Sequence, residues 1–402
     1  MTRKIVILTS IYPGKDINET FTPIVHYFTK EWIKMDCEVI VIHNLAFYHK
    51  FFYFLASIFS KLIAAFTGTN IPNQRLTQVY KYHLDGVIVI RMPIYKSFPR
   101  FRFAKKTIER QEEKIFKELD QSNFIPDIIV GHWENPQLEL ITLLKKRFSS
   151  AVTSLVFHHK ADFLINLYKN NTKEILSSID VFGFRSAPIK ASFKQFGVDE
   201  KNSFMCYSGI PERFTENKNV KKFNAKLASF LFVGTLIKRK YPSEIIDALT
   251  IVYKNNDYKL DYIGGGFESN KIETKIKEKL LSENVTLNGR VTRDKVWEKM
   301  IESDCFIMIS KNEAYGLVYL EAMAAGCITI AAKDEGFDGV IKHGENGFLC
   351  EAGNVEELAI LIEYINKMSI QEKQEISKSA VLTASKLTNF KAAESYLRNL
   401  EK

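Results

Sequence analysis

Short apolar runs rich in β-branched residues alternate with helical patterns along the chain, and this alternation constrains the fold most. The first series comprises KIVIL, EVIVIH, VIVIRMP, DIIVGH and VTSLVF, separated by segments such as TPIVHYFTKEW and KTIERQEEKIFKEL. A second series begins at SFLFVG and continues through KLDYIGG, VTLNG, CFIMIS, CITIAA and GFLCE. Strands separated by helices predict parallel sheets with crossover connections. Two such series predict two doubly wound α/β domains.

The length of the chain agrees with two domains. At 402 residues it exceeds the usual limit for one hydrophobic core. The segment PERFTENKNVKKFNAK is polar, charged and aperiodic, which predicts a linker over residues 211–226. We therefore expect an N-terminal domain over 1–210, a C-terminal domain over 227–380, and a last helix over 381–402 that could pack back on the N-terminal domain.

The composition is that of an ordinary globular protein, with 46% hydrophobic and 26% charged residues, which excludes a disordered chain. The five cysteines are scattered without C-x-x-C pairs, so we expect buried thiols in a reducing compartment and no zinc site. The first residues, MTRKIVILTSIYP, run directly into a strand pattern without the apolar stretch of a secretion signal. These features predict a cytoplasmic protein.

The positive charge is concentrated in the first half of the chain. Of the net charge of +9, residues 1–200 contribute 27 Lys and Arg against 19 Asp and Glu, and the remainder contributes 29 against 28. Residues 45–106 hold ten basic side chains and a single acid, Asp85. Such a patch favours an anionic partner, either a nucleic acid or a membrane surface.

The stretch LAFYHKFFYFLASIFSKLIAAF, residues 45–66, bears on this choice. As a helix it would be apolar around most of its circumference with a narrow polar stripe. Its apolar run is much shorter than the about 20 residues that span a bilayer. It is either a core helix between layers or a helix in the membrane interface. The dense positive charge that follows favours a peripheral anionic membrane surface and no nucleic acid, with expected contacts from Phe51, Phe52, Phe59, Lys61, Arg100 and Arg102.

The stretch NEAYGLVYLEAMAAG, residues 312–326, follows the buried strand CFIMIS. Glu313 would lie in the loop and Glu321 one turn into the next helix. Open parallel sheets bind ligands at the carboxyl ends of their strands, so both carboxylates could face a ligand. One could accept hydrogen bonds from sugar hydroxyls and the other from a ribose diol. A diphosphate between them would meet the free N–H groups at the helix start, around Gly316, Leu317 and Val318.

The phrase S-x-x-E-x-Y-G-L-x-x-x-E-A-M-A-A-G, followed by GVIKHGENGFLC, resembles the C-terminal domain of the retaining nucleotide-sugar glycosyltransferases of family 4. The resemblance extends over residues 229–365 and implies the GT-B fold, with two Rossmann-like domains facing across a cleft. It implies that Glu313 contacts the donor sugar and that Glu321 holds the ribose. The resemblance also implies that Glu313 is a catalytic residue. The pair could serve in this way only if neither were tied up in a buried ion pair.

The resemblance also assigns the phosphate contacts. In FVGTLIKRKYPSEII, Lys240 matches a family lysine that reaches the diphosphate, whereas Thr235 stands where the family has an arginine. Arg239 could substitute, because a guanidinium grips phosphate oxygens in a bidentate way. The resemblance also places Gly264 and Gly266 beside the nucleotide pocket. The other expected donor-side positions are Gly234, Tyr315 and the helix-start residues Gly316, Leu317 and Val318.

Histidines follow two strands of the N-terminal half. His132 ends DIIVGH, and either His158 or His159 after VTSLVF could match a family histidine that approaches the donor sugar and belongs to the catalytic set. We place His132 on the acceptor side together with Gly14 of the first loop. A single histidine is more often structural than catalytic, but two successive strand ends that carry one favour a site.

No Asp-x-Asp pattern and no His/Cys cluster with metal-ligand spacing occurs in the sequence. We therefore expect a donor site without a metal or cofactor, with a UDP- or GDP-sugar as substrate. Lys240, Arg239 and the helix start would stabilise the departing diphosphate.

The function predicted first is a glycosyltransferase of bacterial capsule or O-antigen type. It would extend a glycan or polyprenyl-linked acceptor while peripherally bound at the inner face of the cell membrane. A nucleotide-sugar epimerase or phosphorylase of the same fold acting on soluble sugars is one alternative. A non-catalytic membrane-binding module is the other.

Overall fold

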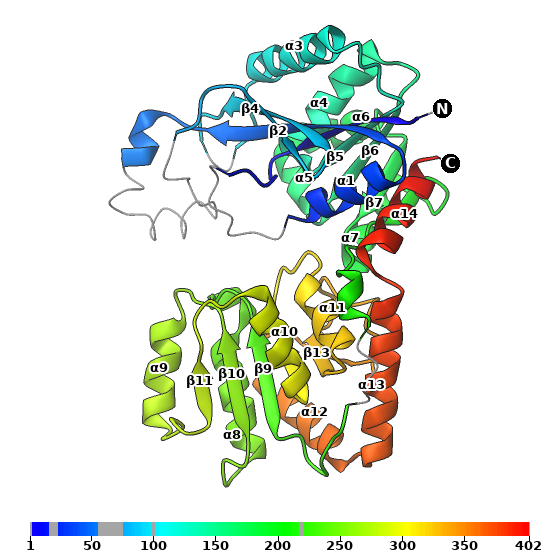
Figure 1. Cartoon of the computed structure of the whole chain (residues 1–402). Helices are drawn as coiled ribbons and strands as arrows, with labels where there is room; N and C mark the ends of the chain where they lie inside the picture. The colour runs from blue at the N-terminus through cyan, green and yellow to red at the C-terminus, as the bar shows by residue number, and fades with distance from the viewer. Residues whose placement is uncertain (1, 16–22, 55–74, 99–100, 217–220, 402) are drawn as a thin grey trace. The chain divides into compact units, whose positions relative to one another are not determined.

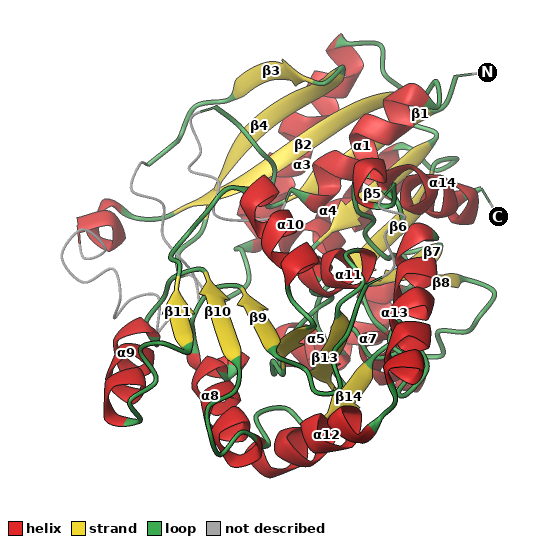
Figure 2. Cartoon of the chain, turned by 60° about the horizontal axis from the view of Figure 1, so that its bottom comes forward, coloured by secondary structure: helices red, strands yellow, loops and turns green. Residues whose placement is uncertain are grey.

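The computed structural model describes residues 2–15, 23–54, 75–98, 101–216 and 221–401. The chain divides into two compact units (Figure 1). The N-terminal unit comprises residues 1–185, 189–206 and 392–402, and the C-terminal unit comprises 186–188 and 207–391. Each unit is a sheet flanked by helices (Figure 2), so the prediction of two Rossmann-like α/β domains is confirmed.

The N-terminal sheet has the strand order β3-β4-β2-β1-β5-β6-β7-β8. Neighbouring strands pair in parallel, except that the edge strand β3 pairs antiparallel with β4. The strands are β1 (Lys4–Thr9), β2 (Glu38–Phe47), β3 (Tyr80–Leu84), β4 (Val87–Tyr95), β5 (Ile128–His132), β6 (Val152–Phe157), β7 (Val181–Phe184) and β8 (Ser203–Met205).

Two hydrophobic cores lie on opposite faces of this sheet, because alternate residues of a strand point to opposite sides. Val6 and Leu8 enter one core and Ile5 and Ile7 the other. Residues of α3 (Lys105–Gln121), α4 (Glu134–Arg147) and α5 (Ala161–Tyr168) pack in the first core, and residues of α1 (Ile24–Lys34) and α14 (Asn389–Leu400) in the second. Shorter elements are α6 (Thr172–Leu176), α7 (Ala187–Ser192) and the 3-10 turns Lys169–Asn171 and Lys194–Phe196.

Helix α14 supplies part of the N-terminal core although it is the last helix of the chain. The indole N–H of Trp32 donates a hydrogen bond of 2.9 Å to the carbonyl oxygen of Ala393. The ring of Tyr396 contacts those of Phe28 and Trp32, with centroid distances of 5.2 and 5.0 Å. Residues from the two ends of the chain therefore form one core.

The structure corrects the expectation of a helix over 45–66. Strand β2 runs to Phe47, because β4 offers pairing partners that far, with Ala46 opposite Ile94 and Phe47 opposite Tyr95. Residues 50–54 are helical. The rest of the stretch lies outside the described residues, and with it the predicted membrane contacts Phe59 and Lys61. The predicted contact Arg100 also lies outside them.

The C-terminal sheet has the order β11-β10-β9-β12-β13-β14, and its described strands all pair in parallel. The strands are β9 (Ser229–Val233), β10 (Lys259–Ile263), β11 (Val285–Leu287), β12 (Cys305–Met308), β13 (Ile328–Ala332) and β14 (Phe348–Cys350). The helices are α8 (Pro242–Val252), α9 (Ser269–Glu278), α10 (Arg293–Glu302), α11 (Leu317–Ala324), α12 (Val355–Lys367) and α13 (Ile370–Ser385), with 3-10 turns at Glu212–Phe214 and Lys238–Lys240.

Each sheet contains a topological switch point, where the strand order reverses. It lies between β1 and β5 in the N-terminal unit and between β9 and β12 in the C-terminal unit. Ligands of open α/β sheets bind beyond the carboxyl ends of the strands at such points. The loops that follow these four strands are therefore the first places to look for a site.

The cysteines and the apolarity of the helices were also considered from the sequence. All five cysteines are buried and free, as predicted from their apolar surroundings. Within the described ranges, no helix combines the length and the apolarity that crossing a membrane requires.

Candidate active site

The loops after β9 and β12 meet at the switch point of the C-terminal sheet. The backbone N–H of Lys311 donates a 2.7 Å hydrogen bond to the carbonyl oxygen of Arg239. This contact brings together the charged side chains that the sequence placed in the two loops. The Glu313 carboxylate lies 3.4 Å from Nη1 of Arg239 and 3.6 Å from Nζ of Lys240.

Lys240 is the more enclosed of the two cations. Its ammonium lies 3.5 Å from the sulfur of Met308, and a Cβ added at Gly234 would come within 3.1 Å of the same nitrogen. Burial lowers the pKa of Lys240, and the Glu313 carboxylate partly offsets that effect. An ammonium shielded from water interacts strongly with an incoming anion, because the surrounding dielectric is low.

The Glu313 loop is supported by the segment that follows β13. The backbone N–H of Glu313 donates a 2.9 Å hydrogen bond to the carboxylate of Glu335. A Cβ added at Gly336 would lie 2.5 Å from the carbonyl oxygen of Glu313 and 2.6 Å from the backbone nitrogen of Tyr315. Neither supporting residue was predicted from the sequence, and the glycine that closely follows a buried strand is the one feature that could have indicated them.

Helix α11 begins beside this loop. Gly316 precedes it with φ of +81°, and the helix start has no side-chain cap. A Cβ at Gly316 would lie 2.4 Å from the ring of Tyr319, whose hydroxyl donates a 2.7 Å hydrogen bond to the carbonyl oxygen of Met308. The backbone groups at Gly316, Leu317 and Val318 thus stand where an anion could bind, next to Lys240 in the same unit.

Glu321 forms an ion pair with Arg293, the first residue of α10. Burial raises the pKa of the Glu321 carboxyl above its usual range, although the arginine opposes that effect. Arg293 was not predicted as its partner. The two residues lie 28 positions apart, and no local pattern connects them.

Both carboxylates are therefore ion-paired, which departs from the expectation of two unpaired groups. The physical reason is burial, because a carboxylate removed from water requires a counter-charge. Neither is fully covered: the side chains of Glu313 and Glu321 keep 14% and 12% exposure. Contact with a ligand would require the cations to share these carboxylates.

Tyr315 has a packing role in the structure. Its hydroxyl donates a 2.9 Å hydrogen bond to the carbonyl oxygen of Ser208. Its buried ring contacts the rings of Tyr207 and Phe337 at centroid distances of 5.7 and 5.2 Å. The side chain thus holds the Glu313 loop against the core of its unit. The backbone of the same loop contacts the turn that carries Lys240, through the hydrogen bond from Lys311 to Arg239.

Two glycines after β10 allow the neighbouring loop to approach the loop that carries Lys240. A Cβ at Gly264, where φ is +133°, would lie 2.0 Å from the carbonyl oxygen of Gly234. A Cβ at Gly266 would lie 2.2 Å from that of Leu236. These positions need glycine because backbone meets backbone there.

In the N-terminal unit, His132 is fully buried. Its Nδ1 lies 3.4 Å from Nε2 of His158, and its Nε2 lies 3.2 Å from the hydroxyl of Tyr396. Burial lowers the pKa of His132 to about 3, so the ring is neutral. His132 has no exposed surface in this structure, and the acceptor-side contact predicted for it stays a prediction. Gly14 is also buried, next to residues 16–22, which lie outside the described chain.

The structure distinguishes the two histidines after β6. His158 is buried and stacks on Trp133 at 4.3 Å, and burial lowers its pKa. The side chain of His159 is 47% exposed, and its Nδ1 lies 2.7 Å from the carboxylate of Glu134. His159 is thus the one of the two whose ring a ligand can reach. Glu134 was not identified by the sequence analysis.

Across the described ranges, no three His, Cys, Asp or Glu side chains gather closely enough to hold a metal ion. The metal-independent donor site therefore remains a prediction.

Comparisons with known proteins agree with this geometry. Residues 213–381 match the family described as "Glycosyl transferases group 1". N-acetyl-alpha-D-glucosaminyl L-malate synthase of Bacillus anthracis is 24% identical over 320 residues, which cover 73% of this chain and 81% of that protein. An uncharacterized glycosyltransferase of Methanocaldococcus jannaschii is 28% identical over 295 residues, covering 71% of this chain and 77% of its own.

Solved structures share the fold over the full length. A glycosyltransferase from Rickettsia africae superposes with a TM-score of 0.70 at 15% identity, covering 100% of this chain and 98% of that one. An Anabaena protein solved in complex with UDP and glucose gives 0.64 at 16% identity and covers 99% of each chain. The fold is that of the GT-B glycosyltransferases, with two Rossmann-like domains built on parallel sheets. The match to the glycosyl transferases group 1 family lies within the C-terminal unit, which carries Lys240, Glu313 and Glu321.

Proposed function

We propose that this protein is a retaining glycosyltransferase that moves a sugar from a UDP- or GDP-sugar to a glycan or polyprenyl-linked acceptor. We place it in the assembly of a bacterial surface polysaccharide of capsule or O-antigen type. One observation carries the proposal: Lys240, Arg239, Glu313 and the start of α11 meet at the switch point of the C-terminal sheet.

The proposed donor site follows from the charges of these groups. The diphosphate binds Lys240 and the amide groups at the start of α11, and Arg239 adds a second cation. Both cations of Glu313 contact its Oε2, and Arg293 contacts Oε1 of Glu321. The other oxygen of Glu313 would accept hydrogen bonds from hydroxyls of the sugar, and that of Glu321 would accept them from the ribose. Negative charge develops on the diphosphate as it departs, and the enclosed ammonium of Lys240 stabilises that charge most.

Nucleotide binding is the first test. In a thermal-shift panel of nucleoside diphosphates and nucleotide sugars, we expect one UDP- or GDP-sugar to stabilise the protein. A ligand at about 100 times its Kd adds roughly 2.7 kcal/mol to the free energy of unfolding. The matching nucleoside monophosphate, which lacks the second phosphate and the sugar, should give a smaller shift. A panel in which no nucleoside diphosphate raises Tm would contradict the donor site.

A membrane partner is proposed from an aromatic patch on the N-terminal unit, made of Phe51, Phe52, Phe98 and Phe101. Neighbouring rings of this set are in contact at centroid distances of 6.0 to 6.2 Å. Phe51, Phe98 and Phe101 are 56%, 57% and 67% exposed. Contiguous exposed apolar surface is typical of interaction sites. The basic residues around it favour a peripheral position on an anionic bilayer.

Two basic side chains close to the patch in the sequence, Lys96 and Arg102, are already engaged within the N-terminal unit. Arg102 forms an ion pair of 2.7 Å with Glu139 and lies over the ring of Tyr168. Lys96 lies over the ring of Phe103, and burial lowers the pKa of Lys96 to about 8. We therefore assign the aromatic rings the larger share of the membrane contact.

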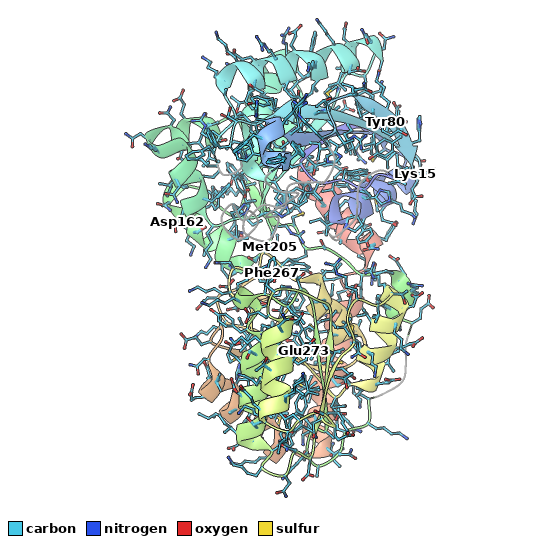
Figure 3. All side chains as sticks on the ribbon, turned by 90° about the vertical axis from the view of Figure 1, so that its left-hand side faces the viewer. Lys15, Tyr80, Asp162, Met205, Phe267 and Glu273 are labelled. Carbon is cyan, nitrogen blue, oxygen red and sulfur yellow. The ribbon has the colours of Figure 1, made fainter. Side chains whose placement is uncertain are left out.

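Vesicle flotation tests this patch. The wild-type protein should float with vesicles of phosphatidylglycerol and phosphatidylcholine, and less with phosphatidylcholine alone. The double variant Phe98→Ser/Phe101→Ser should bind the anionic vesicles at least about tenfold more weakly, because it loses the burial of two aromatic rings. Phe267→Ser is the matched control, since Phe267 lies on the C-terminal unit with 56% exposure (Figure 3). Equal flotation of the double variant and the control would show that the patch is not the membrane contact.

A further inference from the structure

Glu134 is the first residue of α4, and its buried carboxylate contacts the segment that follows β6. The residue is 1% exposed. One carboxylate oxygen accepts hydrogen bonds from the backbone N–H groups of His158 and His159, at 2.7 and 3.0 Å. The other lies 2.7 Å from Nδ1 of His159. The carboxylate thus has three contacts, all with the two residues that follow β6.

Such an arrangement fixes both the backbone and the ring of His159. A buried carboxylate is tolerated only when it is fully hydrogen-bonded or paired with a cation. The ring of His159 also stacks on Phe163 of α5, with a centroid distance of 4.2 Å. Since Nδ1 faces the carboxylate, Nε2 is the ring nitrogen left for a ligand. The ring is therefore held in one orientation at an accessible position.

The charged and titratable groups around His159 come from several elements. Glu134 of α4 is the anion in direct contact. Behind it lie His158, His132 of β5 and Arg185, the residue after β7, whose guanidinium donates a 2.6 Å hydrogen bond to the carbonyl oxygen of Cys206. The charge of Arg185 helps to lower the pKa values of His132 and His158, after burial. These two rings stay neutral and leave Glu134 as the dominant charge at His159.

We propose that Glu134 is a positioning residue for sugar transfer: it holds the ring of His159 through Nδ1, so that Nε2 faces an oxygen of the bound substrate. This inference rests on the proposed function. His159 is the group that contacts substrate, and Glu134 acts through it.

The protonation equilibrium supports this role. Burial lowers the pKa of His159, but the charge of Glu134 and its hydrogen bond outweigh burial, so the pKa is raised above 6.5. A raised pKa means that the ring stays protonated to a higher pH and loses its proton as the pH rises through the folded-state value. Removing the carboxylate should move that loss to lower pH.

The variant Glu134→Gln tests the proposal, because an amide can still accept from the two backbone N–H groups but carries no charge. We expect the alkaline limb of the kcat/KM profile to move to lower pH. The loss of kcat/KM should reach roughly tenfold on the alkaline side of the profile and be small on the acidic side, where the ring is protonated in both proteins. Asp162→Asn is the matched control, an exposed carboxylate three positions after His159 (Figure 3). Its profile should coincide with that of the wild-type protein.

A second measurement separates this inference from the proposed function. The titration of the His159 ring can be followed by NMR in wild-type protein, in Glu134→Gln and in Asp162→Asn, without any substrate. A midpoint that is the same in Glu134→Gln and wild type would overturn the proposal, even if transfer activity is found. A midpoint lowered only in Glu134→Gln, with an unchanged rate profile, would overturn the catalytic part. Should Glu134→Gln fail to fold, the profile of His159→Gln decides, because it must lack the alkaline limb.

Discussion

Replacing Lys240 with methionine is expected to lower kcat by about 10²- to 10³-fold, the usual effect of removing a preorganised group that stabilises developing charge. Methionine preserves most of the apolar stem, so packing against Met308 is retained. The ammonium is the loss, and it is the enclosed cation next to Glu313. Release of the nucleoside diphosphate from the donor identified by thermal shift measures the effect, with KM changing less than kcat.

The matched control is Lys238→Met in the same 3-10 turn. Lys238 is exposed, whereas the Lys240 side chain is 14% exposed. We expect its kcat to stay within about twofold of wild type, because an exposed charge is strongly screened. If both variants lost activity equally, the net charge of the loop would matter and the placement of Lys240 would not. If neither lost activity, the assignment of the diphosphate site would be wrong.

Replacing Gly264 with alanine should destabilise the C-terminal unit by roughly 2–4 kcal/mol, from backbone strain and overpacking together. The added carbon would lie 2.0 Å from the carbonyl oxygen of Gly234, and φ at this position is +133°. Neither the strand end nor the facing loop can move without shifting the turn that carries Lys240. A lowered Tm and weaker donor binding should therefore appear together.

Gly265→Ala provides the control for this experiment. A Cβ at Gly265 meets nothing within 4 Å, although it is the adjacent residue. Its Tm should match wild type, since surface substitutions usually change the free energy of unfolding by less than about 0.5 kcal/mol. Equal Tm values for the two alanine variants would show that the contact between the two loops is not as close as the structure has it.

The parallel sheets could be predicted because their strands carry local patterns. Runs such as CFIMIS and SFLFVG are short, apolar and followed by helical periodicity, and they correspond to β12 and β9. The meeting of Lys240 and Glu313 could also be expected, since both follow strands whose carboxyl ends lie at one edge of the sheet. Local sequence patterns were therefore sufficient to predict the strands and to place Lys240 near Glu313.

The rest depended on partners that are distant in the sequence. The extension of β2 to Phe47 follows from pairing with β4, and the neutral state of His132 follows from packing around Tyr396, 264 residues away. Arg293 beside Glu321 and Glu134 beside His159 are likewise tertiary pairs. Local periodicity indicates which face of an element is buried but not which charge meets another across the fold.

The position of α14 has a consequence for synthesis on the ribosome. Residues 207–391 can complete their own sheet as soon as they emerge, whereas Trp32 and Phe28 wait for Tyr396, which is translated more than 360 residues later. During that interval the early half exposes an apolar surface of the kind that chaperones bind. Expressing the first half alone would therefore require supplying the final helix as well.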